Sequence, residues 1–507
     1  MRTFVDDIAA HAALDPGRIA VTTPAGETTY GELIARIETL AEALRARGAR
    51  PETVCAVAVE RGVDAVVAPA AVIRSGAAFL SLDPEQPPAR LAALVRSGGA
   101  DMLLTSSALA GGLDLPVPGT PVLIDRPQGP AEEAPGNGGA PGNGGAPGGR
   151  ALAYVSHTSG STGEPSAVLV EHAGLDSYLR FVARDYGLGP DTVALQVAPL
   201  GYDASLRDTF APLLAGGRLV VVPRSALLRP EEFGAAVREH AVTALLSVTP
   251  SFLSFLAGQP DAERLLDGVR LVVSSGESLR PFLTAGGRAL VPGALINQYG
   301  PTECTMTSTR HAVPAEPDVL TDVVGTPIDG VVVRLLDEEL SPVADGAVGE
   351  VCIGGVGVAR GYRGRPARTA ECFVPDPLGP PGARMYRTGD LANLGPDGLE
   401  YLGRRDRQVK IRGYRVDPAE VEGALLAHAG VTGAVVTPDT DAQGRVFLVA
   451  HVTGELAEVK DAALRAHLGA SLPPHLMPRR FVRLAELPTT RGGKADRRAL
   501  SQTGGRP

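Results

Sequence analysis

The feature that most constrains the fold is a short turn, rich in glycine and hydroxyl side chains, at residues 158–163. Apolar runs at 151–155 and 167–170 flank the turn and have the composition of buried strands. Glycines allow a tight turn with exposed N–H groups, which together with the hydroxyls suit a phosphate. A Walker A loop is excluded, because Gly163 is followed by Glu164 and not by lysine. The turn therefore predicts a nucleotide site of another kind, with a plain hairpin loop as the alternative.

Strand-like and helix-like runs alternate before and after this turn. Residues 28–48 have apolar side chains at helical spacing, and residues 54–59 resemble a buried strand. This alternation predicts an α/β fold, in which a large N-terminal domain of residues 1–405 has mostly parallel sheets covered by helices. Short strands and glycine turns indicate a small β-rich subdomain at 323–405, and a mobile C-terminal α+β domain is expected at 406–507.

The tract at residues 127–150 interrupts the alternation. The sequence Pro-Gly-Asn-Gly-Gly-Ala occurs twice in succession there, starting at Pro135 and Pro141. Such a composition buries little apolar surface, so the tract is expected to be a flexible linker loop.

Charge and composition exclude several functions. A net charge of −9 argues against a nucleic-acid partner, and no apolar run reaches the ~18 residues that predict a membrane span. The cysteines lack metal-ligand spacing and are expected to be free thiols in a cytoplasmic protein. They are Cys55, Cys304, Cys352 and Cys372.

Lysine is rare in this chain. Of 48 basic residues, only Lys410, Lys460 and Lys494 are lysines. A lysine ammonium is a compact charge that arginine does not replace in every setting. The retained lysines are therefore candidates for a role that needs an ammonium, with chance retention as the alternative.

Several motifs occur in a fixed order along most of the chain. They are the 158–163 turn, Tyr202-Asp203-Ala204-Ser205, Tyr299-Gly300-Pro301-Thr302-Glu303, Thr388-Gly389-Asp390, Gly403-Arg404-Arg405-Asp406 with Lys410, and Gly493-Lys494. In this order they resemble the adenylation domains of nonribosomal peptide synthetases, which belong to the adenylate-forming enzymes together with acyl-CoA synthetases and luciferases.

The resemblance implies two half-reactions. A carboxylate attacks the α-phosphate of ATP in the presence of Mg²⁺ and forms an acyl-adenylate and pyrophosphate. The phosphopantetheine thiol of a carrier protein then takes the acyl group, after the C-terminal domain has rotated. The carrier is expected to be a separate protein, and the need for a small helper protein is left open.

The resemblance also implies roles for individual residues. The catalytic residues would be Lys494, Lys410, Thr302 and Glu303, with Glu303 also holding Mg²⁺ and Asp406 serving as the hinge. Lys494 would act during adenylation, and Lys410 would face the site during thioester formation. ATP would be bound by Thr158, Ser159, Gly160, Ser161, Thr162, Gly163, Gly276, Glu277, Ser278, Asn297, Tyr299, Gly300, Thr302, Asp390 and Arg404.

Asp203 indicates the class of substrate, because amino-acid-activating members of the family pair this aspartate with the substrate ammonium. The pocket would be completed by Ala204, Arg207, Thr249, Val273, Ser275, Gln298, Met306, Thr307 and Lys494. An arginine among polar side chains predicts a polar or acidic amino acid. The alternative is that Arg207 turns away and pairs with Asp208.

One position departs from the family pattern. The loop usually continues with a lysine, whereas Ser166 occupies that position here. The missing lysine supports one alternative function, an ATP-binding paralogue without catalysis. An acyl- or aryl-acid CoA ligase also stays open as a separate alternative.

Overall fold

The computed structural model describes residues 2–126, 148–159, 165–317, 320–441, 445–456, 459–488 and 496–503. The predicted 127–150 linker therefore lies largely outside the described residues, as do Gly160, Ser161, Thr162, Gly163 and Lys494. Among the described residues, no helix has both the length and the apolar character required to cross a membrane.

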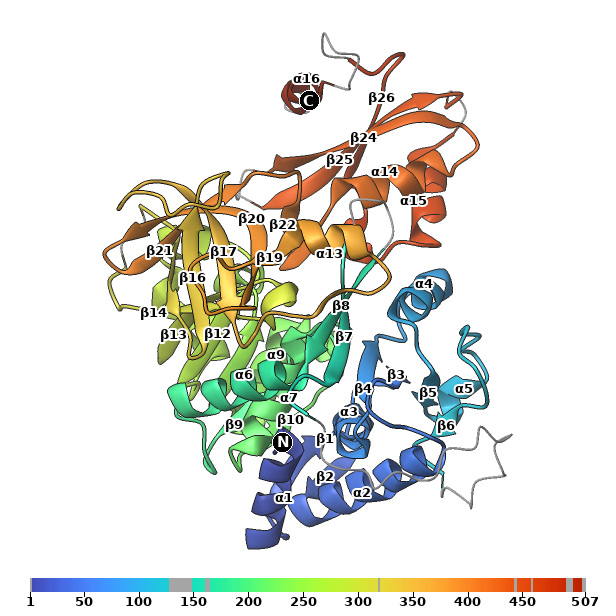
Figure 1. Ribbon diagram of the computed structural model, residues 1–507, viewed down its shortest axis with the longest axis vertical. Coiled ribbons are helices and arrows are strands. Elements are labelled where there is room, and N and C mark those ends of the chain that lie inside the picture. Colours follow the sequence, from blue (N-terminus) through green and yellow to red (C-terminus); the bar gives the residue numbers. More distant parts are fainter. Residues whose placement is uncertain are drawn as a thin grey trace.

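A seven-stranded sheet carries the strands on both sides of the 158–163 turn (Figure 1). Its strands, in spatial order, are β18 (Gly361–Tyr362), β8 (Ser166–Glu171), β7 (Leu152–Thr158), β4 (Ala78–Leu82), β3 (Val54–Ala58), β5 (Met102–Thr105) and β6 (Val122–Leu123). The strands from β7 to β6 are parallel, because helices connect β3, β4 and β5, whereas the direct turn makes β7 and β8 antiparallel. The connecting helices are α3 (Asp64–Ser75), α4 (Pro88–Gly98) and α5 (Ser107–Ala110).

A larger sheet of fourteen strands contains a parallel part and an antiparallel part. The parallel part consists of β13 (Ala294–Tyr299), β12 (Leu271–Ser275), β11 (Ala244–Val248), β9 (Val193–Leu195), β10 (Arg218–Val220) and β1 (Ile19–Thr23), with β2 (Gly26–Thr29) antiparallel at its edge. The antiparallel part consists of β14 (Thr309–Val313), β15 (Val323–Pro327), β21 (Gly398–Arg404), β20 (Arg384–Gly395), β17 (Gly349–Gly355) and β16 (Val331–Leu336), with β19 (Phe373–Pro375) beside β20. The strands expected to form a separate β-rich unit thus continue the same hydrogen-bonded sheet.

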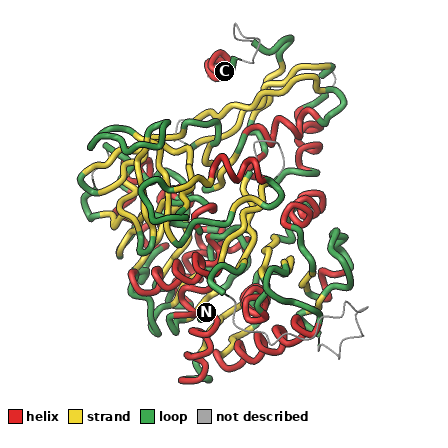
Figure 2. The backbone as a smooth tube through the Cα atoms, viewed as in Figure 1, coloured by secondary structure: helices red, strands yellow, loops and turns green. Residues whose placement is uncertain are grey.

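Helices cover the parallel part of this sheet (Figure 2). They are α1 (Phe4–Leu14), α2 (Tyr30–Ala46), α6 (His172–Asp185), α7 (Ala204–Leu214), α8 (Arg224–Leu227), α9 (Pro230–Glu239), α10 (Pro250–Ala257), α11 (Ala262–Leu265) and α12 (Arg280–Thr284). Helix α13 (Pro366–Cys372) lies instead beside β18, β19 and β20. In α2, Thr29 and Glu32 cap each other's backbone amides, and Leu33, Ile37 and Leu44 are buried at helical spacing. Local capping and an apolar stripe therefore place this helix on the core.

The C-terminal part forms a third unit of α+β structure at one end of the molecule (Figure 1). It contains the hairpin of β22 (Val409–Ile411) and β23 (Tyr414–Val416), and the sheet of β24 (Val431–Thr440), β25 (Val446–Gly454) and β26 (Arg480–Arg483). Its helices are α14 (Pro418–Leu426), α15 (Asp461–Gly469) and α16 (Arg497–Thr503). Together with the two larger sheets, this arrangement confirms the predicted fold class.

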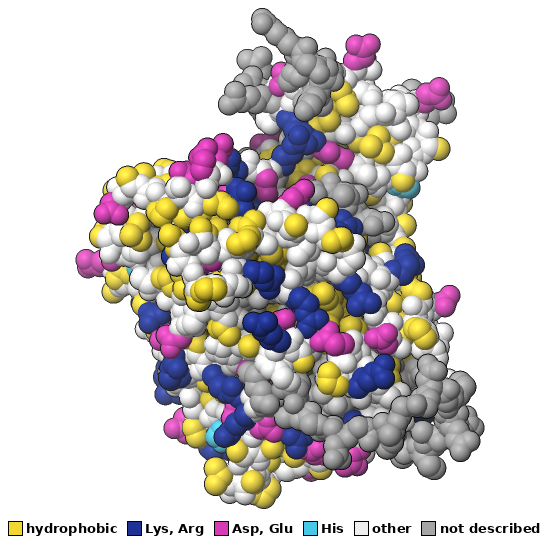
Figure 3. Space-filling view, in the orientation of Figure 1, with side chains coloured by type: hydrophobic (Ala, Val, Ile, Leu, Met, Phe, Trp, Pro, Cys, Tyr) yellow, Lys and Arg dark blue, Asp and Glu magenta, His cyan; other side chains and the backbone are white. Residues whose placement is uncertain are grey.

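Charged side chains of both signs are interspersed over the face shown in Figure 3. Such a surface agrees with the net charge of −9 and gives no broad basic stretch on that face.

Candidate active site

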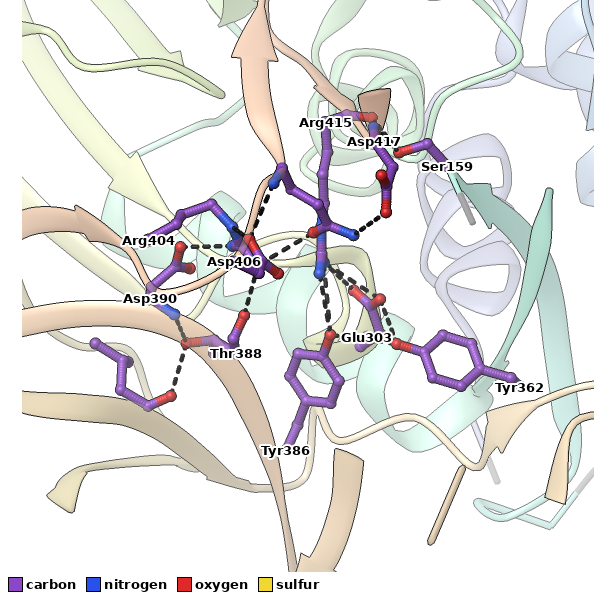
Figure 4. Close-up of polar contacts among 12 residues, drawn as sticks. Ser159, Glu303, Tyr362, Tyr386, Thr388, Asp390, Arg404, Asp406, Arg415 and Asp417 are labelled. Atoms are coloured by element: carbon purple, nitrogen blue, oxygen red, sulfur yellow. Dashed lines mark hydrogen bonds and ion pairs between the residues drawn. The ribbon is translucent and has the colours of Figure 1, made fainter. Parts of the chain in front are cut away.

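The phosphate-turn region meets the C-terminal hairpin (Figure 4). The Ser159 hydroxyl follows β7; it donates to the backbone carbonyl of Arg415 at 2.8 Å and accepts the backbone N–H of Asp417 at 3.0 Å. Ser166, at the position where the family usually has lysine, starts β8 opposite Thr158 and is buried. The start of the turn, at Ser159, is therefore in direct contact with the β22–β23 hairpin and the residue that follows it.

Glu303 lies in the short 3₁₀ helix Thr302–Cys304 and is 1% exposed. Its carboxylate accepts the Tyr362 hydroxyl at 2.7 Å and forms an ion pair with Arg415 at 3.1 Å (Figure 4). Among the described residues, no group of three His, Cys, Asp or Glu side chains could hold a metal. A single carboxylate fits Mg²⁺ in the manner common for this ion, in which substrate phosphates and water supply the other ligands. In the observed arrangement, the positive charge beside Glu303 is that of the Arg415 guanidinium.

The expected ribose site is a closely bonded cluster (Figure 4). The buried Asp390 carboxylate accepts the Tyr299 hydroxyl and an Arg404 N–H, each at 2.6 Å. Arg404 also forms an ion pair with Asp406, the expected hinge residue, at 2.7 Å. Arg404 thus links a residue of the large sheet to the point at which the C-terminal part begins.

Lys410 faces this cluster from β22. Its ammonium lies 5.4 Å from the ring centre of Tyr299 and 5.2 Å from that of Tyr401, both within cation–π range. Burial lowers the pKa of Lys410, although the Asp390 carboxylate acts in the opposite direction. Lys410 lies directly opposite Arg415 in the antiparallel β22–β23 hairpin, so the two positively charged side chains enter the site next to each other.

The segment after β12, which is expected to contact ATP, meets the C-terminal hairpin. The Glu277 carboxylate accepts the backbone N–H groups of Ser251 at 2.9 Å and Gly413 at 2.8 Å, so it joins α10 to the hairpin. Gly276 has a φ of +93°, and a Cβ there would lie 3.1 Å from Gly413. Glycine at this position therefore permits the close approach of the hairpin.

The amide of Asn297 is only partly satisfied. Its nitrogen donates to the Val323 carbonyl at 2.8 Å, whereas its oxygen is buried without a partner among the described residues. Asn297 also lines a cavity together with Leu279 and Asp322, and Ser278 bonds to Asp322 beside it. Gly300 lies close to the backbone of Ser308, where a side chain would collide.

Asp203 occupies the N-cap position of α7, without a side-chain capping hydrogen bond. One of its carboxylate oxygens is buried and has no partner within the described part of the chain. Burial raises the pKa of Asp203, and the Thr302 side chain acts against this by hydrogen bonding to the carboxylate. A cation placed beside this oxygen would remove the penalty of burying the charge.

Arg207 lies one helical turn after Asp203 and is 1% exposed. Its guanidinium donates to Ser247 at 2.9 Å, Tyr178 at 3.0 Å and Ser275 at 3.2 Å, and also to the Gln298 carbonyl oxygen. The alternative orientation toward Asp208 is not adopted. The Asp208 carboxylate instead accepts the backbone N–H groups of Val197 and Ala198.

Three pocket residues were missed by sequence reasoning: Ser247, Tyr178 and Tyr186. Ser247 on β11 contacts Arg207, whereas Thr249 caps α10 by accepting the N–H of Phe252. A buried arginine requires acceptors, so a search for hydroxyls near Arg207 could have found them. Of the other expected pocket residues, Thr307 bonds to Gln298 at 3.1 Å. The remaining three, Ala204, Val273 and Met306, lie at the start of α7, on β12 and after the Thr302–Cys304 helix.

An aromatic stack joins the pocket region to the C-terminal part. Tyr414 stacks on His475 with ring centres 3.9 Å apart and contacts Tyr202, the neighbour of Asp203, at 4.5 Å. Burial lowers the pKa of His475 to about 3, so the imidazole is neutral in this stack. Arg90 on α4 and Glu420 on α14 add a buried ion pair between the two parts.

Comparisons with known proteins agree with this arrangement. A family model described as "AMP-binding enzyme" matches residues 8–363, and one described as "AMP-binding enzyme C-terminal domain" matches residues 420–494. Phosphinothricin tripeptide synthetase PhsC of Streptomyces viridochromogenes is 40% identical over 98% of this chain, and bacitracin synthase 3 of Bacillus licheniformis is 36% identical over 96%. The chain spans 45% and 7% of the lengths of these two relatives.

Solved structures give the same result. PA1221, described as a nonribosomal peptide synthetase protein containing adenylation and carrier domains, has a TM-score of 0.81 and 29% identity, and the match covers 98% of this chain and 84% of that one. AB3403, a four-domain synthetase bound to AMP and glycine, has a TM-score of 0.68 and 29% identity, over 99% of this chain and 36% of that one.

Proposed function

The chain belongs to the AMP-binding enzyme family as an adenylation domain of the nonribosomal peptide synthetase type, and from this premise we propose that it activates an acidic amino acid. ATP and the amino acid would yield an aminoacyl-adenylate and pyrophosphate. The acyl group would then pass to the phosphopantetheine thiol of a separate carrier protein.

One observation carries the choice of substrate. Arg207 is a buried cation without a carboxylate partner among the described residues, and Asp203 has a buried carboxylate oxygen without any partner there. These two groups of opposite charge lie four residues apart, on one side of α7. The guanidinium of Arg207 also attracts the neighbouring Asp208 carboxylate electrostatically, but its hydrogen bonds go to neutral side chains. Buried charges normally require a partner. An amino acid supplies an ammonium for Asp203, and an acidic side chain such as that of aspartate or glutamate supplies an anion for Arg207.

The nucleotide end of the site would bind ATP. Tyr299 would stack on the adenine, the unpaired Asn297 oxygen would accept its amino group, and Asp390 would accept the ribose hydroxyls with help from Arg404. The turn at 158–163 would hold the outer phosphates, and Lys494 would contact the reacting carboxylate and phosphate. Mg²⁺ held by Glu303 would neutralise negative charge on the phosphates. Thr302 would contact the α-phosphate beside it.

The second step would use the arrangement seen here. Lys410 lies over Tyr299, and Arg415 lies beside Glu303. These contacts support a role for Lys410 in thioester formation. Rotation about Asp406 would remove both cations and bring Lys494 to the site for adenylation.

The proposed function can be tested by pyrophosphate exchange that depends on the amino acid. The panel should contain aspartate, glutamate, their amides, aliphatic and aromatic amino acids, and carboxylic acids without an amino group. We expect the highest kcat/KM with an acidic amino acid. Exchange with plain carboxylic acids and transfer to free CoA would identify a CoA ligase instead. ATP binding without any exchange would identify a paralogue that lacks catalysis.

A further inference from the structure

Helix α6 brings two tyrosine hydroxyls to the hydrogen-bond network around Arg207. Tyr178 lies within this helix and Tyr186 caps its end, eight residues later and therefore on the same side. Both hydroxyls reach the polar network of the pocket, although α6 precedes the Asp203 motif in sequence. This helix is thus in a position to influence which substrate the pocket accepts.

The hydrogen bonds of Arg207 show which N–H groups of its guanidinium already have an acceptor. The guanidinium has five N–H groups. Nε donates to Ser247, and Nη1 donates to Tyr178 and Gln298. Nη2 donates to Ser275 and keeps one N–H that has no partner among the described residues. Arg207 is therefore fixed on three sides and keeps one donor on the Nη2 edge.

Tyr178 belongs to a closed triangle of hydrogen bonds. Its hydroxyl lies 3.1 Å from the Thr307 hydroxyl and 3.3 Å from the Gln298 carbonyl oxygen, and Thr307 donates to that same oxygen at 3.1 Å. The Gln298 nitrogen donates to the Tyr186 hydroxyl, which keeps the amide oxygen turned toward Arg207. Tyr178 therefore accepts an N–H of Nη1 directly, and Tyr186 orients the Gln298 oxygen that also accepts from Nη1.

We propose that Tyr178 is a positioning residue that determines substrate specificity, because it holds Nη1 of Arg207 so that the free Nη2 edge meets the substrate carboxylate. Tyr186 supports the same orientation through Gln298. This inference rests on the proposed function and adds to it two residues of α6, outside the segments in which the other pocket residues lie.

Loss of the Tyr178 hydroxyl would leave one Nη1 N–H without an acceptor in a buried position. The guanidinium would then turn to regain a partner and would no longer present Nη2 to the substrate. An acidic side chain would lose a bond made to a charged donor, whereas a neutral aliphatic side chain makes no such bond. The change should therefore appear as a loss of discrimination and not as a uniform loss of activity.

The test compares Tyr178→Phe with Tyr30→Phe in the full-length chain. Tyr30 is a matched control, because it is fully buried and its hydroxyl donates to backbone carbonyls of Leu213 and Gly217, away from the pocket. Pyrophosphate exchange is measured for each variant with an acidic amino acid and with a neutral one, and the melting temperature is recorded. We expect Tyr178→Phe to lower the acidic-to-neutral ratio of kcat/KM by about 10- to 100-fold, mainly through KM, as for a lost bond to a charged group. Tyr30→Phe should leave the ratio unchanged.

A ratio that is unchanged in Tyr178→Phe, or an equal loss for both substrates, would overturn the inference. If this variant does not fold, Tyr186→Phe decides the question, with a smaller decrease of the ratio expected. A wild-type protein without preference for acidic amino acids would overturn the proposed function itself. A wild-type preference that survives both substitutions would overturn only the role of α6.

Discussion

The two ends of the active site are built in different ways. At the substrate end, Arg207 is held by side chains from α6, β11, β12 and β13, all within the N-terminal part of the chain. At the nucleotide end, Glu303 and Ser159 receive their partners from the β22–β23 hairpin and the residues beside it. The groups that hold Arg207 all lie in one part of the molecule, whereas the second end depends on how the C-terminal part docks.

This difference suggests that the substrate end selects the amino acid, whereas the nucleotide end supplies the charges that each catalytic step needs. A pocket formed by one rigid part can keep the same geometry in both half-reactions, so the same groups can hold the amino acid throughout. A nucleotide end that exchanges its cations can stabilise different charges in the two steps. We therefore expect substitutions at the substrate end to change which amino acid is used, and substitutions at the hairpin to change one step only.

The largest effect is expected for Arg207→Ala. Loss of the buried cation leaves the substrate carboxylate unpaired, at a cost of about 3–5 kcal/mol. This corresponds to roughly two to four orders of magnitude in kcat/KM for an acidic amino acid. Neutral amino acids should gain relative to acidic ones in pyrophosphate exchange.

Arg61→Ala is the matched control for this prediction. Arg61 donates to the carbonyls of Ala198, Gln196 and Val222, so its loss should reduce stability without changing the preferred substrate. Strong exchange with an aliphatic amino acid, combined with indifference to Arg207→Ala, would show that the pocket is interpreted wrongly.

The second prediction concerns the two lysines assigned to the nucleotide end. Loss of a charge directed at a transition state typically costs ~10²–10³ in rate. Lys494→Ala should reduce adenylate formation by this amount, whereas Lys410→Ala should mainly slow transfer from preformed adenylate to the carrier. Single-turnover measurements of each step check this.

Lys460→Ala supplies the control, since this exposed lysine precedes α15 away from the nucleotide end. It should leave both steps unchanged. Equal effects of Lys494→Ala and Lys410→Ala on both steps would contradict the assignment of one lysine to each step.

The third prediction concerns Arg415, which pairs with Glu303 only when the hairpin is docked. Arg415→Met leaves that buried carboxylate with the Tyr362 hydroxyl alone and should destabilise the docked arrangement. We expect transfer to the carrier to slow by about tenfold, equivalent to ~1.4 kcal/mol. Adenylate formation should change by less than about threefold, because that step is expected to use the undocked arrangement.

Arg412→Met tests whether the charge of the hairpin alone matters. Arg412 is exposed at the turn of the same hairpin and should be replaceable without effect on transfer. If both variants slow transfer equally, the Glu303 ion pair has no specific role.

The fold class could be predicted from the sequence because the spacing of apolar residues distinguishes buried strands from amphipathic helices. The strands beside the 158–163 turn and the helix at 28–48 were both expected, and β7, β8 and α2 occupy these segments. The sequence also predicts short strands after residue 323, but not that they join the parallel strands in one sheet, because this depends on the pairing of β14 with β15.

The site could be predicted only in part, because motifs identify residues and not their orientations. Ser247 and Thr249 share one face by strand alternation, but β11 ends at Val248, so Thr249 caps the next helix instead. The direction of Arg207 is set by Tyr178, which lies in a distant segment of the sequence. Arg415 was missed because its role depends on hairpin docking, and nothing in its local sequence distinguishes it from other arginines.

The smallest effect is expected from a change that touches neither end of the site. The tract at 130–148 is dominated by glycine, proline and asparagine, and its composition predicts that it buries little surface. The free energy of closing a loop changes only by about 0.6 kcal/mol for each doubling of its length. Replacement of the tract by a short Gly-Ser linker should therefore leave both half-reactions within about threefold, and the ratio between acidic and neutral amino acids unchanged. Exchange assays and melting temperatures of the shortened protein check this.

A loss of ATP binding would show that the tract supports the nucleotide end through the adjoining strand β7. A changed amino-acid preference would show that the substrate end is not built solely from the residues identified here.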